Sequence, residues 1–471
     1  MMGIDFLVLM KQEWMVIAIL FILLFIKVSS NDWQNENILK LVNILLFVNL
    51  ITGFFGYRDG ILFNEMFKTN HLIVTEKNIL SLGTFIVSLQ SWSWLKNNKQ
   101  VLEFYLLLLS TLLGMFFMIS AGNLLMFYLG LELSSIPLAA LANFDLEKRK
   151  SAEAAFKFII SSAFSSGLLL FGISLVYGTT GTLTLSALPE HLDGSPLQMF
   201  AFILLISGFG FKISAVPFHL WTADVYEGSP VTVTSYFSVI SKGSVLFVFV
   251  TVLYTAFKTY AIIWNHILFI LSVFTMVIGN LFAIRQNNLK RFLAFSSISQ
   301  VGFILIGMSG QSQAGTASVV YFILIYTFSN LGAFGVISLV SAYTGRENIE
   351  DYKGFYKTNP RLSWVLAISL FSLAGIPPTA GFFGKFFLLM AGAGQGNYLL
   401  ITIAALNMVI SLYYYLKIIK AIFMDSNENP INRLLTPASP KLALIICTTG
   451  IIMTGFVSYI YEYIFSMSTI F

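Results

Sequence analysis

Apolar residues in this chain gather in about fourteen long runs, and polar residues gather in the short segments between them. A helix needs about 20 apolar residues to cross the hydrocarbon core of a bilayer, and most of these runs reach that length. The pattern therefore predicts membrane-spanning helices near residues 12–28, 38–57, 76–95, 100–119, 122–143, 150–178, 197–225, 229–256, 259–284, 288–308, 317–343, 361–392, 398–424 and 440–464.

The fold class follows from what a bilayer allows. Each backbone N–H and C=O group in the hydrocarbon core needs a partner within the protein, so we predict an all-α, polytopic membrane helix bundle of about 14 transmembrane helices. Composition agrees, because 57% of the residues are hydrophobic, the mean hydropathy is +0.82 and only 10% are charged. Soluble domains carry about 25% charged residues, so a globular soluble enzyme is excluded. We expect the run at 12–28 to be a retained helix, not a cleaved signal peptide.

Two of the runs carry the same interruption, about 160 residues apart. Pro217 in SAVPF and Pro377 in SLAGIPPTAGFFGKFF both lie inside a run, and the lysines Lys212 and Lys385 accompany them. Proline removes a helical hydrogen bond, and interrupted backbone is tolerated at this depth only where it is buried in protein or lines water. The offset predicts two inverted five-helix repeats that contain broken helices, as in many transporters.

The same offset divides the chain into four expected parts. These are an N-terminal three-helix segment at 1–95, a first repeat with spans 4–8 at 100–256, a second, inverted repeat with spans 9–13 at 259–424, and a C-terminal span at 440–464.

Basic residues are unevenly distributed between alternate loops. Of the 27 Lys and Arg residues, seventeen lie in one set of loops and five, namely Lys11, Arg58, Lys68, Lys77 and Lys258, lie in the other. The positive-inside rule makes the first set cytoplasmic. With an even number of spans, both termini are then expected on the periplasmic side. This bias accounts for the net charge of +5, so no nucleic-acid partner is needed to explain it.

The remaining five lysines lie within predicted spans, where a charge costs about 2.5–3.5 kcal/mol on insertion scales. Glu132 is interpreted as the only acidic residue deep in a span. Three interpretations are open: Lys417 reaches a nearby interface by snorkelling, the set forms structural ion pairs, or it forms a proton path. Burial disfavours a lysine's charged form and a carboxylate favours it, so a buried lysine beside Glu132 can exchange protons. The five are Lys157, Lys212, Lys242, Lys385 and Lys417.

Motifs for other chemistry are missing from the sequence. GFFGK at 381–385 fails the phosphate-loop pattern, and AGAGQG at 391–396 lacks the dinucleotide-binding spacing. His219 and Asp224 are five residues apart with no third ligand evident, which disfavours a metal site. The single cysteine, Cys447, excludes a cysteine-ligated cluster. We therefore expect this chain to bind no cofactor or metal.

Three segments carry a family resemblance: PFHLWTADVYEGSPVTVTSYFSVISK (217–242), NLKRFLAFSSISQVGF (288–303) and SLAGIPPTAGFFGKFFLL (372–389). They resemble the subunit N (subunit 2) family of proton-pumping NADH:quinone oxidoreductase, or respiratory complex I, whose members are antiporter-like. The resemblance covers the chain from about residue 76 to the last span, and it implies a fold of fourteen helices with two inverted repeats.

Roles for the candidate residues are implied by this resemblance. Glu132 pairs with Lys212 in a first half-channel, and Lys157 relays near them. Lys242 is the central lysine and Lys385 the lysine of a second half-channel. His219, which follows the first helix break, and Asp224 are secondary candidates. The sequence departs from the family at Ala223 and near Thr232, where proline is common, and at Gln300, where many members have histidine. The last departure leaves the path between Lys242 and Lys385 to water or other side chains.

The function expected is proton translocation in the membrane arm of complex I, coupled to electron transfer in other subunits. Those partner subunits are expected to hold NADH, FMN, iron–sulfur clusters and quinone. The expected partners are other membrane-arm subunits and the lipid bilayer, and the expected location is a bacterial inner membrane. Two alternatives are a subunit of a multi-subunit cation/proton antiporter and a scaffold subunit that conducts nothing.

Overall fold

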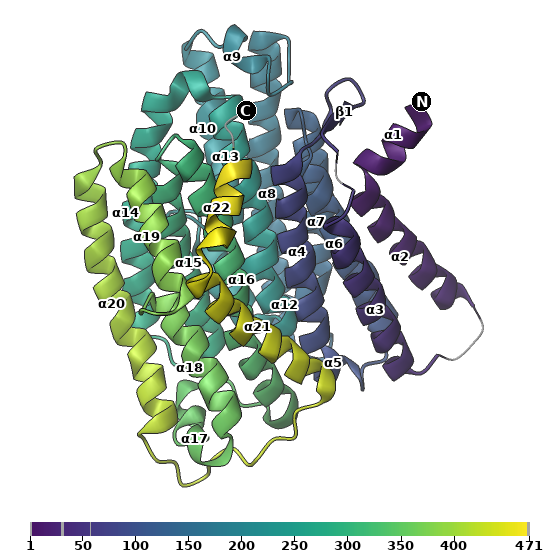
Figure 1. The fold of residues 1–471 in the computed structure, drawn as a ribbon, viewed down its shortest axis with the longest axis vertical. Helices are drawn as coiled ribbons and strands as arrows, with labels where there is room; N and C mark the ends of the chain where they lie inside the picture. The colour runs from purple at the N-terminus through teal and green to yellow at the C-terminus, as the bar shows by residue number, and fades with distance from the viewer. Residues whose placement is uncertain (1, 30–32, 57, 469–471) are drawn as a thin grey trace.

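The computed structural model describes residues 2–29, 33–56 and 58–468. It is a bundle of long helices that run roughly parallel to one another (Figure 1). The uninterrupted long helices are α2 (Lys11–Val28), α3 (Asn35–Gly53), α4 (His71–Gln90), α6 (Val101–Ile119), α7 (Leu124–Ala142), α8 (Arg149–Thr180), α14 (Ala261–Ile284), α15 (Leu289–Met308), α16 (Gln313–Thr344) and α20 (Tyr398–Phe423).

Four further spans are interrupted. Two are broken by irregular backbone, between α10 (Pro196–Ile213) and α11 (Leu220–Gly228) and between α18 (Pro360–Ala374) and α19 (Ala380–Ala393). The span at 231–255 consists of α12 (Val231–Tyr236), the π-helix η1 (Phe237–Ser241) and α13 (Lys242–Thr255). The last span, predicted as one run at 440–464, is divided into α21 (Ala438–Phe456) and α22 (Ser458–Met467), because Val457 takes an extended conformation.

The helix count matches the sequence prediction. Twelve helical segments are long and apolar enough to cross a membrane. Among the described residues, α2 and the broken α18–α19 pair are the two further predicted spans. The chain is therefore a multi-pass membrane protein of all-α class, and the prediction of about 14 spans is confirmed.

The remaining elements are short and lie at the two ends of the bundle. Near one end are α1 (Met2–Leu9), α9 (Leu188–His191), η2 (Lys258–Tyr260) and an antiparallel hairpin of β1 (Gly60–Leu62) and β2 (Phe67–Thr69). The other end carries α5 (Trp92–Leu95), η3 (Ile349–Tyr352) and α17 (Phe355–Thr358). Figure 1 shows α5 and α17 at the lower end and β1 and α9 at the upper end. The lower end carries the basic loops, and we call it the basic end.

The centre of the bundle is formed by α15 and α16, each 94% buried along its apolar window. In contrast, only 33% of the windows of α20 and α21 is buried. Side-chain caps fix where several central helices begin. Asn70, Asn123, Asn288 and Ser312 accept hydrogen bonds from first-turn N–H groups of α4, α7, α15 and α16, which are otherwise unpaired. Two of these capped helices, α7 and α15, carry serines that accept hydrogen bonds from buried lysines.

Candidate functional site

Lys212 lies in the last turn of α10, where three helices meet. Only 8% of its surface is exposed. Its Nζ donates hydrogen bonds to Ser135 Oγ on α7 and Ser162 Oγ on α8, both at 2.8 Å. Hydroxyl oxygens are neutral acceptors, so the ammonium is hydrogen-bonded without having its charge neutralised by them.

Glu132 precedes Ser135 by three residues on α7, so the two side chains lie on neighbouring parts of one helix face. The carboxylate is half-buried, and its Oε1 is a buried atom without a hydrogen-bond partner. Glu132 and Lys212 attract each other electrostatically. Among the described residues, however, no ion pair joins them, which differs from the direct pair that the resemblance implies. The Lys212 amine donates its hydrogen bonds to the serine hydroxyls instead.

Hydrogen bonds stabilise the break after α10. Ser214 ends the helix in the left-handed region, at φ +63°, and its Oγ accepts a hydrogen bond from Thr222 on α11 at 2.7 Å. Trp221 Nε1 donates to the Phe211 carbonyl at 3.1 Å. Ser214 and Ala215, at the start of the break, are therefore buried in protein, one of the two conditions under which irregular backbone is stable in a membrane, whereas Pro217 is exposed.

His219 and Asp224 follow the break but face different surroundings. Nδ1 of His219 is buried without a hydrogen-bond partner, and the ring interacts electrostatically with Lys242. Asp224 forms ion pairs with Lys157 of α8 and Arg291 of α15, each at 2.7 Å. Within the described chain, no group of three or more metal-ligating side chains includes either residue.

Lys157 belongs to this ion-pair cluster. It also pairs with Glu153 at 2.7 Å, and its side chain is 40% exposed. It contacts neither Glu132 nor Lys212 by any hydrogen bond or ion pair in the described structure. The described structure thus pairs Lys157 with Glu153 and Asp224, and the role that the resemblance implies for it stays a prediction. Lys417 is exposed on α20, as a snorkelling lysine would be.

Lys242 begins α13, directly after the π-helical turn η1, and is 3% exposed. Its Nζ donates to Ser297 Oγ on α15 at 2.9 Å and lies 5.3 Å from the centre of the Tyr226 ring. π-Helical turns are rare and often occur at functional sites. As with Lys212, the hydrogen-bond partner is a neutral hydroxyl.

A small cavity of about 10 Å³ adjoins Lys242 and is also lined by Ser297, Gln300 and Tyr326. That volume corresponds to about one water molecule, and a water needs two to four polar partners. Gln300 is one of the lining residues, and its Oε1 is a buried acceptor without a hydrogen-bond partner among the described residues. The cavity thus lies between Lys242 and the residue that replaces the family's histidine.

Lys385 on α19 lies at the second break and is 1% exposed. Its Nζ donates to the Leu373 and Ala374 carbonyls, at 2.8 and 3.1 Å, which end α18. Carbonyls at a helix C-terminus carry partial negative charge and attract cations. Gly375 follows at φ +85°, and a Cβ atom there would lie 3.1 Å from Cδ of Lys385.

Gln300 connects the two lysine sites. Its Nε2 donates to the same Leu373 carbonyl at 2.9 Å and to the Tyr415 hydroxyl at 3.2 Å. Gln300 therefore shares a hydrogen-bond acceptor with Lys385 and lines the same small cavity as Lys242.

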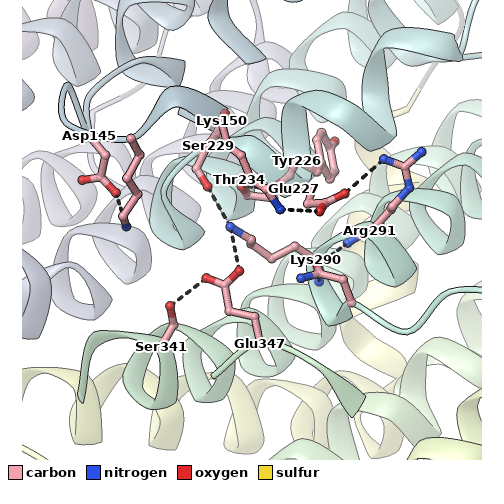
Figure 2. Close-up of polar contacts among 12 residues, drawn as sticks. Asp145, Lys150, Tyr226, Glu227, Ser229, Thr234, Lys290, Arg291, Ser341 and Glu347 are labelled. Carbon is pink, nitrogen blue, oxygen red and sulfur yellow. Dashed lines mark hydrogen bonds and ion pairs between the residues drawn. The ribbon is translucent and has the colours of Figure 1, made fainter. Parts of the chain in front are cut away.

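Polar groups at the basic end form a second cluster, drawn in Figure 2. Lys290, only 5% exposed, donates to the Ser229 carbonyl at 3.1 Å and pairs with Glu347 at 3.0 Å. A polar cavity of about 400 Å³ adjoins this pair. The hydroxyls of Ser229 and Thr232 line it as buried groups without hydrogen-bond partners. The cluster was missed from the sequence because the run of basic residues at 285–291 was interpreted as a solvated loop.

Glu132 is not the only acidic residue that is buried within the described helices. Glu13 on α2 forms an ion pair with Lys77 on α4, and each side chain is 1% exposed. Glu76 is 3% exposed. Lys77 was assigned to a loop, yet it lies 5.1 Å from the ring centre of Phe67. Opposite charges near the starts of two neighbouring spans were the available signal for this pair.

The sequence is similar to that of a known protein family. A family model described as "NADH:quinone oxidoreductase/Mrp antiporter, TM" matches residues 121–411. NADH-quinone oxidoreductase subunit N of Phocaeicola vulgatus is 48% identical over 453 residues, 95% of each chain. Its counterpart from Azobacteroides pseudotrichonymphae is 46% identical over 97% of each chain. This chain belongs to the family of NADH-quinone oxidoreductase N subunits.

Solved structures share the fold of this family member over nearly its whole length. A chain of respiratory complex I from Thermus thermophilus superimposes with a TM-score of 0.83 at 25% identity, covering 97% of this chain and 99% of that one. A chain of the Mrp complex from Dietzia gives a TM-score of 0.84 at 19% identity, covering 97% of this chain and 96% of that one, which establishes similarity of fold alone. The recognition of the antiporter-like family from the sequence is confirmed.

Proposed function

We propose that this chain translocates protons as a membrane-arm subunit of NADH-quinone oxidoreductase, coupled to electron transfer from NADH to quinone in other subunits. The surroundings of Lys212, Lys242 and Lys385 support this proposal most directly. All three are buried, all donate to hydroxyl or carbonyl oxygens, and none has an ion-pair partner among the described residues. Burial disfavours the charged form of an amine, and without a carboxylate contact such an amine can release its proton.

The first step of proton transfer takes place at Lys212. Glu132 affects the proton affinity of this lysine through the electric field of its carboxylate. A redox-driven rearrangement in a neighbouring subunit changes the field at these two residues, and the proton affinity of the lysine changes with it. Moving one charge across 100 mV requires about 2.3 kcal/mol. A change in the field from a nearby carboxylate in a low-dielectric interior reaches this size.

The proton then moves by way of Lys242 toward Lys385 and the outside. His219 lies between the first two lysines in this proposal, because its unpartnered Nδ1 follows the break after Lys212 and its ring is near enough to interact with Lys242. A water molecule in the small cavity carries the proton past Gln300. The amide orients that water through Oε1 and does not itself titrate.

The proposal also includes the partner subunits, the membrane and the division of the chain into parts. Oxidation of NADH and reduction of quinone take place in other subunits, which hold the FMN, iron–sulfur clusters and quinone, while this chain holds none. The membrane is the bacterial inner membrane, with the basic end cytoplasmic and both termini periplasmic. The two inverted repeats are assigned to 100–256 and 259–424, with additional parts at 1–95 and 440–464.

Lys242→Ala tests the relay. In the intact complex reconstituted into liposomes, we expect this variant to lose the share of proton transport that passes through this chain. The matched control is Lys417→Ala, because Lys417 is an exposed lysine of the same bundle. A normal proton-to-electron ratio in Lys242→Ala complex would overturn the relay and favour the scaffold alternative.

An antiporter subunit remains the other candidate, because chains of that class share the fold. Co-purification with dehydrogenase subunits supports the oxidoreductase, and sodium-driven proton exchange without NADH oxidation supports the antiporter.

A further inference from the structure

A deep groove of about 900 Å³ opens at the basic end, outside the proton-transfer site. Its walls come from the start of α18, the segment 433–436 that precedes α21, and the first half of α21. The groove therefore lies between two membrane helices, at the ends of both helices where their first turns begin.

The rim of the groove is strongly basic and lacks any acidic lining residue within the described structure. Each of the four cations at the rim has an exposed side chain, and none of these side chains forms a hydrogen bond or ion pair that the structure records. They are Lys357, Arg361, Arg433 and Lys441. Four cations that repel one another in one groove are stabilised by an anion between them.

Backbone groups add to this positive potential. The helices α18 and α21 both begin at the groove, and neither has a side-chain cap at its N-terminus. The first N–H groups of a helix lack internal partners, and the helix dipole makes this end positive, so helix N-termini bind phosphate groups well.

The rim is held in place by one buried side chain. Asn359, 5% exposed, does not cap α18. Its Nδ2 donates to the Asn432 carbonyl at 3.0 Å, and its Oδ1 accepts from the Leu434 backbone N–H at 2.8 Å. These bonds fix the backbone on both sides of Arg433 beside the start of α18. The arrangement of the cations is therefore a built feature of the fold.

Below the rim the groove is apolar. Leu362, Val365, Leu444 and Ile445 line it, and Ile445 is 50% exposed. Lining residues continue along α21 from Lys441 to Thr449, a rise of about 12 Å. A free phosphate ion would leave this wall exposed, whereas a molecule with an anionic head and an apolar tail would cover both parts.

We propose that this groove binds an anionic phospholipid, with its phosphate at the basic rim and an acyl chain along α21. Basic pockets between membrane helices on the cytoplasmic side are known to suit such lipids. The two features of the groove, unpaired cations and an apolar wall in the membrane, are those of one lipid molecule. This site is independent of the proton relay, and it stands or falls separately from the proposed function.

Native mass spectrometry of the intact complex tests this site. The complex is incubated with phosphatidylglycerol or, in parallel, phosphatidylcholine, and the lipids that remain bound to this chain on its release are counted. The wild-type chain should retain phosphatidylglycerol preferentially. Each Lys or Arg near a membrane surface contributes about fivefold to anionic-lipid binding, so Arg361→Gln with Lys441→Gln should weaken retention about 25-fold. The control is Arg149→Gln with Arg285→Gln, which removes two exposed charges from the same end and should change nothing.

Four results would overturn the site. The first is equal retention of the two lipids, and the second is unchanged retention in the Arg361→Gln, Lys441→Gln chain. The third is a density map of the complex in lipid nanodiscs that shows side chains of a neighbouring subunit in the groove. Competition by glycerol phosphate as strong as by phosphatidylglycerol would also contradict the proposal, because it would show an anion site that makes no use of the apolar wall.

Discussion

Gln300 and Lys385 donate hydrogen bonds to one carbonyl oxygen, that of Leu373, at 2.9 and 2.8 Å. The two side chains come from α15 and α19 and meet at the free C-terminal end of α18. A glutamine therefore reaches the second lysine site directly, and the same residue lines the cavity beside Lys242, with its amide oxygen unpartnered. This places a side chain that cannot titrate between two that can.

Gln300→Leu should reduce proton transport through the chain about tenfold, because it removes the acceptor that orients water in the cavity, and one hydrogen bond in such a site is worth about 1.4 kcal/mol. Gln300→His should retain transport, since an imidazole can both accept and donate. The measurement is the proton-to-electron ratio of the reconstituted complex. Gln286→Leu, which alters a glutamine outside the site, is the control, and equal ratios in the two leucine variants would contradict the orienting role.

Gly375→Ala and Gly396→Ala form a matched pair. Both glycines have positive φ, +85° and +77°, so either alanine should destabilise the fold by about 1 kcal/mol. Only at Gly375 would the added Cβ meet the Lys385 side chain, whereas nothing lies within 4 Å at Gly396. Thermal unfolding should therefore change similarly in both, and proton transport should fall only in Gly375→Ala. Equal transport in the two variants would show that the position of the lysine is not critical.

Ser135→Ala with Ser162→Ala removes both hydroxyl partners of Lys212. We expect the amine to turn toward Glu132 and form a direct ion pair, which holds the proton and slows transport about tenfold, since charge-assisted bonds are worth about 1.5–3 kcal/mol. Ser134→Ala is the control, because Ser134 bonds only to its own helix at the Leu131 carbonyl. Transport rates equal to wild type in the double variant would mean that the hydroxyls do not set the state of the lysine.

Lys77→Met should destabilise the protein by about 3–5 kcal/mol, because it leaves the Glu13 carboxylate buried without its partner. Adding Glu13→Gln should recover most of that loss. The exposed pair of Lys27 with Glu103, whose side chains are 48% and 37% accessible, provides the comparison, and Lys27→Met should cost at most about 1 kcal/mol. Chemical denaturation of the purified complex measures all three, and an unchanged midpoint for Lys77→Met would contradict the buried-pair assignment.

Much of the fold was predictable because spans are long and apolar, and the lysines at 212, 242 and 385 stood out as charges inside them. The two breaks were predictable for the same reason, since proline and lysine both disturb an apolar run. Contacts across helices were not predictable from one sequence. The sequence shows where Lys157 lies along α8, but it does not show that Lys157 forms an ion pair with Asp224.

The errors have one physical origin. Lys77 and Lys290 lie near span ends, where the sequence suggests solvent. Phe67 of the β1–β2 hairpin lies close to Lys77, and Ser229 and Glu347 contact Lys290. Burial near a helix end depends on what packs there. The role of Gln300 was foreseen only as a gap in a histidine relay, and its hydrogen bond to Leu373 required the coordinates.

The cavity beside Lys242 has room for about one water molecule. A continuous file of water would let ions short-circuit the membrane whenever the respiratory chain is idle. A cavity of this size cannot hold such a file, so we expect the resting bundle to conduct no ions until a rearrangement widens this point.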